Sequence, residues 1–325
     1  MKKIIIIGKV PNPIGGVTIH VSRLIDSLGT ASVNYHFISL SEISYIKLFI
    51  YLTKFPFIHL HTSNPFLRFT SALISFIFRN KIIITFHGNL GRYNKIKNLL
   101  DLLSVKFAHI PIVLNEDSFK KALLFNKMTQ LIPAFIPPKN ESKLPKNILL
   151  KIKMLKKENA LVFCTNAYNV SFDSHKREVY SISHLIRLFT TISDRGLIIS
   201  DPSGEYIKYI KNKKILIPKN VVFFSEPHDF IEIIKNTNCF IRATTTDGDS
   251  LSVKEALYFN IRVIASDCVP RPNECLLFSI NNFDNLKTII LNYNSYKTVQ
   301  SNKPIDGSIA LKKLYDSLLK DKKYV

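Results

Sequence analysis

Short apolar runs alternate along the chain with longer stretches whose apolar residues recur at helical spacing. The runs are rich in Ile, Val and Phe, which is typical of strands buried on both faces of a parallel sheet. The predicted strands are 3–7, 35–39, 57–60, 81–86, 110–114, 130–132, 160–164, 197–200, 220–224, 239–242 and 262–265. Helical patterns such as 16–28, 41–52, 64–78 and 117–125 fill the gaps, so the chain predicts an α/β fold with right-handed crossovers.

About eleven strands suit two doubly wound sheets better than one. Three prolines within 133–138 mark the boundary, because they can continue neither a helix nor a central strand. We therefore predict two Rossmann-like parallel-sheet domains, 1–138 and 139–325, that face each other across a cleft. The amphipathic terminal helix 308–320 is expected to pack back on the first domain.

The composition is that of a globular protein, with 325 residues of which 46% are hydrophobic and 21% charged. The four cysteines are scattered and form no CxxC pair, which favours a reduced, cytoplasmic protein without a disulfide framework. No apolar run is long enough to cross a membrane, and the apolar start leads into a turn rich in Gly and Pro. We therefore expect neither a transmembrane helix nor a signal peptide.

The charge indicates anionic partners, since 45 Lys and Arg against 24 Asp and Glu give a net +21. The region 1–140 alone holds 17 basic and 5 acidic residues. A nucleic-acid binder is disfavoured because the lysines are spread out, Trp is absent and no known module is present. The aromatic and basic segment 45–55 suits an anionic membrane surface, and the alternative is a core helix with snorkelling lysines.

Ligands of open parallel sheets bind beyond the carboxyl ends of the strands. The predicted strand 239–242 is followed by a polar turn, 244–250, that runs into a helix. The backbone amides of 249–252 are expected at the N-terminus of that helix, where they suit a diphosphate or a sugar hydroxyl. Glu255 lies one turn later and could accept two vicinal hydroxyls. The alternative is an ordinary helix cap with an acidic first turn.

Two features of the first half also follow strands. Gly15 and Gly16 open a helix and would let backbone amides approach a phosphate, although a plain glycine turn is an equal alternative. His87 ends the strand 81–86 and is followed by Gly88. A histidine at this end of a strand is suited to polar work in a cleft.

The other histidines of this half are expected to be structural. His20 lies inside the helix that Gly16 opens, and we expect it to be packed rather than a ligand. His59 and His61 face one side of a strand, but no third ligand at metal-binding spacing appears. We therefore expect core or rim histidines and no metal site.

Several of these segments together resemble a known family. The segments 247–257 and 263–267 resemble the glutamate–seven residues–glutamate signature of glycosyltransferase family 4, and 269–272 resembles its bacterial O-antigen and capsule members. The glycine pair, His87-Gly88 and the proline segment fall where that family has its glycine loop, cleft histidine and interdomain crossing. The resemblance spans nearly the whole chain and implies the glycosyltransferase-B fold, with the nucleotide-sugar held mainly by the C-terminal domain.

The resemblance also implies roles for individual residues. His87 and Asp247 would be catalytic, with His87 near the reacting face of the transferred sugar and Asp247 in contact with that sugar. Glu255 would bind the ribose hydroxyls. The donor-binding residues expected are Gly15, Gly16, Asn166, Lys176, Arg177, Gly248, Asp249, Ser250, Leu251 and Glu255.

The chain departs from the family in two places. Asp247 stands where the family has a glutamate and is one methylene shorter. The family usually has an Arg and a Lys after the first strand of the second domain, where they neutralise the leaving diphosphate, whereas 164–169 here is uncharged. Lys176 or Arg177 is our candidate replacement, and if neither reaches the diphosphate, activity would be weak or absent.

The function that the resemblance implies is that of a retaining hexosyltransferase. It would move a hexose-type sugar from a nucleotide-diphosphate donor to a polyprenyl-linked saccharide acceptor, in the synthesis of bacterial O-antigen or capsule at the inner face of the cytoplasmic membrane. No metal or other cofactor is expected, since amides and cations can stabilise the leaving diphosphate. The alternatives are a sugar-nucleotide epimerase on the same fold and a catalytically degenerate binding protein.

Overall fold

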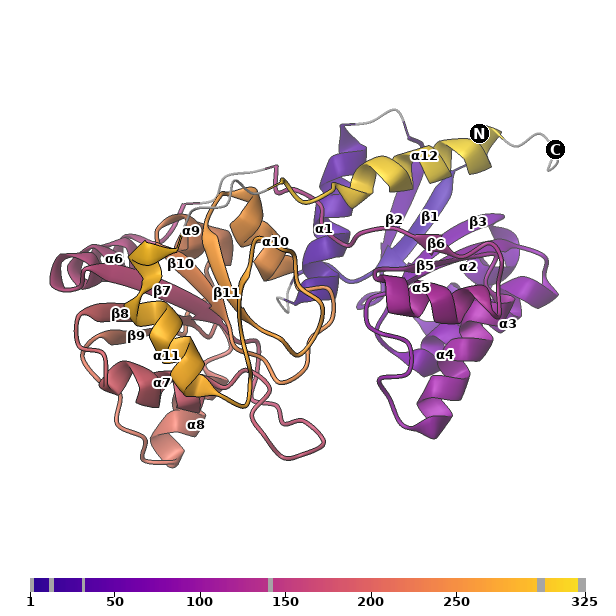
Figure 1. Cartoon of the computed structure of the whole chain (residues 1–325). Coiled ribbons are helices and arrows are strands. Elements are labelled where there is room, and N and C mark those ends of the chain that lie inside the picture. The colour runs from indigo at the N-terminus through magenta and orange to yellow at the C-terminus, as the bar shows by residue number, and fades with distance from the viewer. Residues whose placement is uncertain (1–2, 12–14, 31–32, 140–142, 297–301, 321–325) are drawn as a thin grey trace. The chain divides into compact units, whose positions relative to one another are not determined.

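The computed structural model describes residues 3–11, 15–30, 33–139, 143–296 and 302–320 (Figure 1). The chain divides into two compact units. Unit 1 runs to Lys139 and includes the chain from Ile305 onward, and unit 2 is Asn140–Pro304. The second unit therefore stops short of the predicted 139–325, because the terminal helix α12 (Gly307–Lys320) packs within unit 1.

Unit 1 is a six-stranded parallel sheet in the order β2-β1-β3-β4-β5-β6. Alternate residues of the fully buried β1 enter two different cores, with Ile4 and Ile6 on one face and Ile5 and Ile7 on the other. This period of two is what a strand covered on both faces requires. The elements are β1 (Ile4–Gly8), α1 (Gly16–Gly29), β2 (Tyr35–Ser39), α2 (Tyr45–Lys54), β3 (Phe57–His61), α3 (Pro65–Ile77), β4 (Lys81–Phe86), α4 (Lys95–Phe107), β5 (Ile110–Val113), α5 (Glu116–Leu123), β6 (Gln130–Leu131) and α12.

Helix α12 covers one face of this sheet beside α1 (Figure 1). Its buried residues Leu311 and Tyr315 join the same core as Ile4 and Ile6. A glycine is required where the helix begins, because a Cβ on Gly307 would lie 2.0 Å from the carbonyl oxygen of Pro133. The Gly307 N–H instead donates to Phe135 O at 2.8 Å. This bond fixes the start of α12 against the segment that follows β6, near the end of the first stretch of unit 1.

Unit 2 is a second six-stranded parallel sheet, in the order β12-β11-β10-β7-β8-β9. Its strands likewise divide their residues between two cores, with Phe163 of β7 in one and Cys164 in the other. The elements are α6 (Lys146–Glu158), β7 (Leu161–Asn166), α7 (Ile182–Thr190), β8 (Arg195–Ser200), α8 (Glu205–Asn212), β9 (Val221–Phe224), α9 (Phe230–Lys235), β10 (Cys239–Arg242), α10 (Leu251–Tyr258), β11 (Arg262–Ser266), β12 (Leu276–Phe278), α11 (Phe283–Leu291) and the 3-10 turn Tyr293–Ser295.

The predicted α/β class with two parallel sheets is confirmed. Each predicted strand is present within two residues at either end, and β12 is an addition that the sequence pattern did not predict. The predicted helix 41–52 begins instead at Tyr45, where the Ser44 side chain accepts from the Lys47 N–H. Within the described residues no helix combines the length and apolar character that spanning a membrane would need.

Candidate functional site

In unit 2, three strands that are neighbours in the sheet end in polar residues. Strand β7 ends at Asn166, β10 at Arg242 and β11 at Ser266. Because β7, β10 and β11 are parallel and adjacent, their carboxyl ends lie along one edge of the sheet. The turn after β10 leads from this edge into α10, as the sequence predicted, so the candidate donor site is built here.

The most densely bonded group at this edge is an arginine–aspartate–arginine cluster. The Arg242 guanidinium donates through Nε and Nη2 to both oxygens of Asp247, at 2.9 and 3.0 Å. Arg271, which follows β11, donates through Nη1 to Asp247 Oδ2 at 2.8 Å. The Gly248 N–H donates to Oδ1 at 3.0 Å and the Thr244 hydroxyl lies 3.5 Å from Oδ2. Asp247, predicted to touch the sugar, therefore has its oxygens occupied by the protein itself.

The cluster is buried and strongly ionised. The Asp247 side chain is 8% exposed, that of Arg242 12% and that of Arg271 2%. Burial alone would raise the pKa of Asp247, but Arg242 and Arg271 outweigh it and hold that pKa at about 2. Arginine remains protonated throughout, so two cations share one anion and the cluster keeps a net positive charge.

Asn166 joins this cluster to the N-terminus of α10. Its Oδ1 accepts from Arg242 Nη1 at 3.2 Å, and its Nδ2 donates to Ser252 Oγ, in the first turn of α10, at 3.0 Å. Ser250 caps the helix, with its Oγ accepting from the Val253 N–H at 3.5 Å. The predicted Asn166 and the α10 start are thus held together by side-chain hydrogen bonds.

The remaining predicted donor residues of this loop have definite places. Asp249 pairs with Lys254, whose Nζ donates to Oδ2 at 2.6 Å. Glu255 is buried inside α10, as a residue one turn into the helix should be. A Cβ on Gly248 would meet no described atom within 4 Å, and Leu251, the first residue of α10, is half-buried. A ligand could therefore approach the backbone from the Gly248 side.

Lys176 and Arg177 lie on a loop beside this turn. The Thr245 N–H donates to Val179 O at 2.9 Å, which holds the two segments together. Both predicted cations are exposed, and Arg177 is already paired with Asp173 at 2.8 Å. Burial raises the pKa of Asp173, but hydrogen bonds from Arg177 and from the His175 N–H together outweigh it and hold that pKa at about 2. The structure thus gives Arg177 a local partner, whereas Arg242 and Arg271 form the buried positive charge.

In unit 1 the glycine pair caps α1. The Gly15 N–H donates to Thr18 Oγ1 at 3.0 Å, and that hydroxyl donates back to Gly15 O at the same distance. A Cβ on Gly16 would meet nothing within 4 Å among the described residues. Packing inside the protein therefore does not require glycine at position 16, which leaves room for a ligand to approach the first turn of α1.

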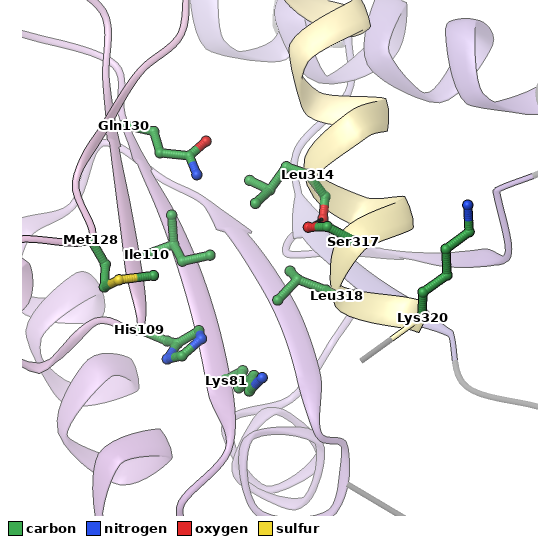
Figure 2. A pocket seen from close by; sticks show the side chains of 9 residues that line it. All are labelled: Lys81, His109, Ile110, Met128, Gln130, Leu314, Ser317, Leu318 and Lys320. Carbon is green, nitrogen blue, oxygen red and sulfur yellow. Dashed lines mark hydrogen bonds between the residues drawn. The ribbon is translucent and has the colours of Figure 1, made fainter. Parts of the chain in front are cut away.

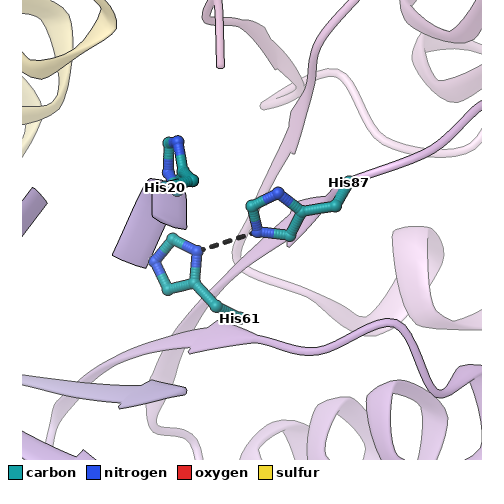
Figure 3. A group of neighbouring side chains, drawn as sticks. All are labelled: His20, His61 and His87. Atoms are coloured by element: carbon teal, nitrogen blue, oxygen red, sulfur yellow. Dashed lines mark hydrogen bonds between the residues drawn. The ribbon is translucent and has the colours of Figure 1, made fainter. Parts of the chain in front are cut away.

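Three histidines from separate elements gather at the carboxyl edge of the unit 1 sheet (Figure 3). His20 comes from α1, His61 ends β3, and His87 directly follows β4. His61 Nδ1 and His87 Nε2 share a hydrogen bond of 3.1 Å, and the His20 ring centroid lies 5.4 and 5.0 Å from those of His61 and His87. His87, the predicted catalytic histidine, is the half-buried member of the group.

His61 and His87 are uncharged at neutral pH. Burial lowers the pKa of His61 and of His87 well below the usual value, and the neighbouring histidines lower both further. Arg68 and Arg92 add to the effect on His87. His87 can therefore exchange hydrogen bonds with a sugar hydroxyl as a neutral imidazole, but it does not provide a positive charge.

The same three residues could hold a transition-metal ion. One ligand nitrogen from each lies within 4.8 Å of the others, and His20 Nδ1 donates to Ala134 O at 2.7 Å, as metal-binding histidines commonly do. Against this, two arginines act on His87, and His61 Nε2 has no hydrogen-bond partner in the described chain. The sequence has no third ligand at metal-binding spacing beside His59 and His61. The fold instead brings His20 and His87 to His61, and His59 is not part of this group.

A cavity of about 550 Å³ lies elsewhere in unit 1, under α12 (Figure 2). Its wall includes Lys81, Ile110 and Gln130, the first residues of β4, β5 and β6. These residues mark the amino ends of the strands, opposite to the edge that carries the histidines. The cavity is therefore separate from the candidate site.

The residues that sequence reasoning missed are the partners of the predicted ones. Arg242 was visible only as the last residue of a strand, and Arg271 only as part of a motif. His20 and His61 were expected to be structural. Their place in the sequence could have identified two of them as candidates, because Arg242 ends a predicted parallel strand and His61 directly follows one.

Two six-stranded parallel sheets with flanking helices define the class: the chain has the glycosyltransferase-B fold. Anabaena HepE in complex with UDP and glucose superposes with a TM-score of 0.71 at 14% identity, covering 99% of this chain and 100% of that one. Sucrose-phosphate synthase of Thermosynechococcus elongatus gives 0.65 at 16% identity, covering 98% and 99%. UDP-GlcNAc 2-epimerase of Neisseria meningitidis bound to UDP-GlcNAc gives 0.63 at 14% identity, covering 99% and 100%.

Sequence comparison points in the same direction. The chain is 26% identical over 213 residues to an uncharacterized glycosyltransferase of Methanocaldococcus jannaschii, which covers 60% of this chain. The match spans about half of that relative, 49% of its length. No family model matches the chain. The predicted resemblance to a glycosyltransferase is confirmed by this sequence match, and the predicted fold is confirmed by the structural comparisons.

Proposed function

We propose that this protein transfers a hexose-type sugar from a nucleotide-diphosphate donor to a lipid-linked saccharide, with retention of anomeric configuration. The observation that carries the proposal is the turn between β10 and α10. It joins a buried positive cluster, the helix N-terminus and the buried Glu255 at one edge of the unit 2 sheet. Positive charge and backbone amides suit a diphosphate, and a carboxylate suits ribose hydroxyls.

Donor binding is tested by calorimetry with UDP-, GDP- and dTDP-sugars. We expect one of them to bind, and Glu255→Gln to weaken it more than tenfold, because hydrogen bonds to a charged acceptor contribute about 1.5–3 kcal/mol each. Glu205→Gln is the matched control, since Glu205 is an exposed carboxylate in the first turn of α8. Unchanged affinity in Glu255→Gln, or no binding by any donor, would contradict the proposal.

Transfer itself is tested with the donor that binds and a polyprenyl-linked saccharide. We expect sugar transfer that depends on the acceptor, and NMR of the product is expected to show the donor's anomeric configuration. Conversion of the donor to its epimer without an acceptor would instead support the epimerase alternative, which the likeness to the Neisseria meningitidis epimerase favours. Binding without either reaction would support a degenerate binding protein.

The proposal includes no metal cofactor. Arginines and helix amides carry the positive charge that a leaving diphosphate requires, so we expect full activity after dialysis against EDTA. Activity that is lost in EDTA and restored by a divalent metal would contradict this part. The variant His61→Gln would then show whether the histidine group of unit 1 is the site concerned.

We further propose that unit 1 binds the anionic inner face of the cytoplasmic membrane, where the lipid acceptor resides. Helix α2 exposes Tyr45 and Ile46 at 86% and 76%, and Phe49 stacks edge-to-face with the exposed Phe78 that follows α3. Lys47 and Lys54 lie on the same helix, Arg79 follows Phe78 in the chain, and all three are exposed. Aromatic and basic residues together are typical of interfacial membrane binding.

Vesicle sedimentation tests this surface. We expect binding to vesicles that contain phosphatidylglycerol, and a large loss in the double variant Tyr45→Ser/Ile46→Ser. Leu216→Ser is the control, because Leu216 is 80% exposed but lies in unit 2. Equal sedimentation of the double variant and the wild type would refute the role of α2.

A further inference from the structure

The cluster of Arg242, Asp247 and Arg271 in unit 2 leaves one positive charge without a counterion among its own three members. We propose that this cluster is what neutralises the donor diphosphate, acting from behind the first turn of α10, and that Asp247 positions the two arginines instead of contacting the sugar. This inference rests on the proposed function. The family resemblance gave neither Arg242 nor Arg271 a role in donor binding.

The bonding of Asp247 excludes it as a free acceptor. Its Oδ1 accepts from Arg242 Nη2 and from the Gly248 N–H, both at 3.0 Å. Its Oδ2 accepts from Arg242 Nε at 2.9 Å and from Arg271 Nη1 at 2.8 Å. A sugar hydroxyl could bind Asp247 only by displacing one of these four donors, three of which are N–H groups of positively charged arginines, and the hydroxyl itself carries no charge.

The two arginines are held in fixed positions. Arg271 also donates through Nε to Ser266 O at 3.1 Å and through Nη2 to Thr244 Oγ1 at 3.3 Å. The Arg242 guanidinium lies over the Tyr180 ring, 5.3 Å from its centroid. Buried cations that cannot relax away form a preorganised positive field, which is more effective toward an anion than flexible surface lysines.

The excess charge lies close to the amides that would bind the phosphates. Arg242 Nη1 donates to Asn166 Oδ1, and Asn166 in turn donates to Ser252 Oγ in the first turn of α10. A buried charge without a full counterion is costly in the free protein. A diphosphate bound at α10 would supply the missing counterion and relieve that cost. The cluster would therefore favour binding of the phosphates in particular.

The other cations near this turn are less suited to the role. Arg177 is exposed and paired with Asp173 at 2.8 Å. Lys254 is paired with Asp249, with 2.6 Å between Nζ and Oδ2. Each of these pairs is neutral as a whole, whereas the Arg242–Asp247–Arg271 cluster is not.

The test compares UDP, UMP and uridine, because the three ligands share a nucleoside and differ in phosphate charge. Calorimetry on the full chain is expected to show UDP affinity at least tenfold weaker in Arg271→Gln, with UMP affected less and uridine unchanged. Arg271→Lys keeps the charge and is expected to stay within about threefold of wild type. Arg187→Gln is the matched control, on an exposed arginine of α7, and should bind all three ligands normally.

Asp247→Asn makes the two assignments of Asp247 distinguishable. It raises the cluster charge by one but removes a carboxylate oxygen that holds the arginines, so we expect the affinities for UDP and for UDP-sugar to change by the same factor, with their ratio unchanged. A selective loss of UDP-sugar affinity would show that Asp247 contacts the sugar and would overturn the inference. Circular dichroism and thermal unfolding show whether each variant is folded. If Arg271→Gln does not fold, Arg271→Lys and Asp247→Asn carry the test.

Failure of this inference and of the proposed function give different results. If wild type binds neither UDP nor any nucleotide-sugar, the proposed function is wrong and the inference falls with it. If wild type binds UDP but Arg271→Gln loses UDP and uridine equally, Arg271 is only structural and the inference alone is wrong. Equal UDP affinity in Arg271→Gln and wild type would also overturn it.

Discussion

Acid should destabilise unit 1 well before its carboxylates titrate, because the buried His59 and His61 and the half-buried His87 resist protonation. Burial lowers the pKa of His59 from 6.5 to about 3, with a smaller contribution from His20. His59 is enclosed by hydrogen bonds, since its Nε2 lies 2.8 Å from Thr85 Oγ1 and its Nδ1 contacts the Tyr315 hydroxyl. Burial lowers the pKa of His61 and His87 in the same direction.

Whether acid raises or lowers stability follows from comparing the protons bound by the folded and the unfolded chain. Above pH 6.5 neither form protonates these histidines, so they do not affect stability. Below pH 6.5 the unfolded chain takes up a proton on each, while the folded chain does not, and stability falls as the pH falls toward the folded pKa. For His59 the loss between pH 7.5 and pH 5 is about 2 kcal/mol, and His61 and His87 add losses of the same sign. The free energy of unfolding of a domain is only about 5–15 kcal/mol, so the effect is large.

Urea unfolding followed by far-UV circular dichroism measures this, and it suits a chain without Trp. We expect the free energy of unfolding of unit 1 to fall steeply from pH 6.5 to pH 5. In His59→Gln the slope should decrease by about 1.4 kcal/mol per pH unit, because one proton-binding site of the unfolded chain is gone. His36→Gln is the control, since His36 is exposed on β2.

A flat pH profile between 6.5 and 5 would refute the reasoning, because it would mean that the folded and unfolded chains bind the same number of protons. An unchanged slope in His59→Gln would refute the role of His59 in particular. The informative quantity is the slope of the free energy of unfolding against pH. It reports proton uptake even where the substitution itself lowers stability at pH 7.5.

Two further predictions concern packing inside unit 1. Asp101→Ala should lower the free energy of unfolding by about 3–5 kcal/mol in urea, because it leaves Arg68 as an uncompensated buried charge. The two side chains are each 3% exposed and 2.6 Å apart. The double variant Arg68→Met/Asp101→Leu should recover most of this loss, and equal losses in both would contradict the argument. Gly307→Ala should speed hydrogen exchange throughout α12, because its Cβ would lie 2.0 Å from Pro133 O. Gly16→Ala, with open space around its Cβ, should leave α12 exchange unchanged.

The fold could be predicted because strands buried on both faces are nearly all apolar, and proline breaks the pattern at the domain boundary. Strand β1 is an example, with five buried residues in succession. Strand β12 escaped prediction because it has only three residues, of which Leu277 is 50% exposed. The sequence led us to expect the terminal helix on the first domain, and Tyr315 and its neighbours lie in the unit 1 core. Which residues of that core they meet could not be predicted from spacing along the chain.

The place of the candidate site on each sheet could be predicted, but the hydrogen-bond partners of its side chains could not. The rule that ligands bind beyond the carboxyl ends of parallel strands located Asn166, His87 and the turn before α10. The partners could not be predicted, because Arg271 reaches Asp247 across 24 positions of the chain and the course of the intervening loop decides the contact. His20 likewise meets His61 only because α1 packs beside the strand that His61 ends.

The two units carry different kinds of polar group at their candidate sites, and the difference suits the proposed reaction. Unit 2 has guanidinium groups that stay charged at every physiological pH, which a diphosphate requires both when bound and when leaving. Unit 1 has histidines that burial keeps neutral, although the surrounding sequence is strongly basic. Neutral imidazoles can both donate and accept hydrogen bonds, which under the proposed function suits sugar hydroxyls. The burial that lowers the pKa of His87 therefore keeps this edge of the unit 1 sheet uncharged and simultaneously makes unit 1 sensitive to acid.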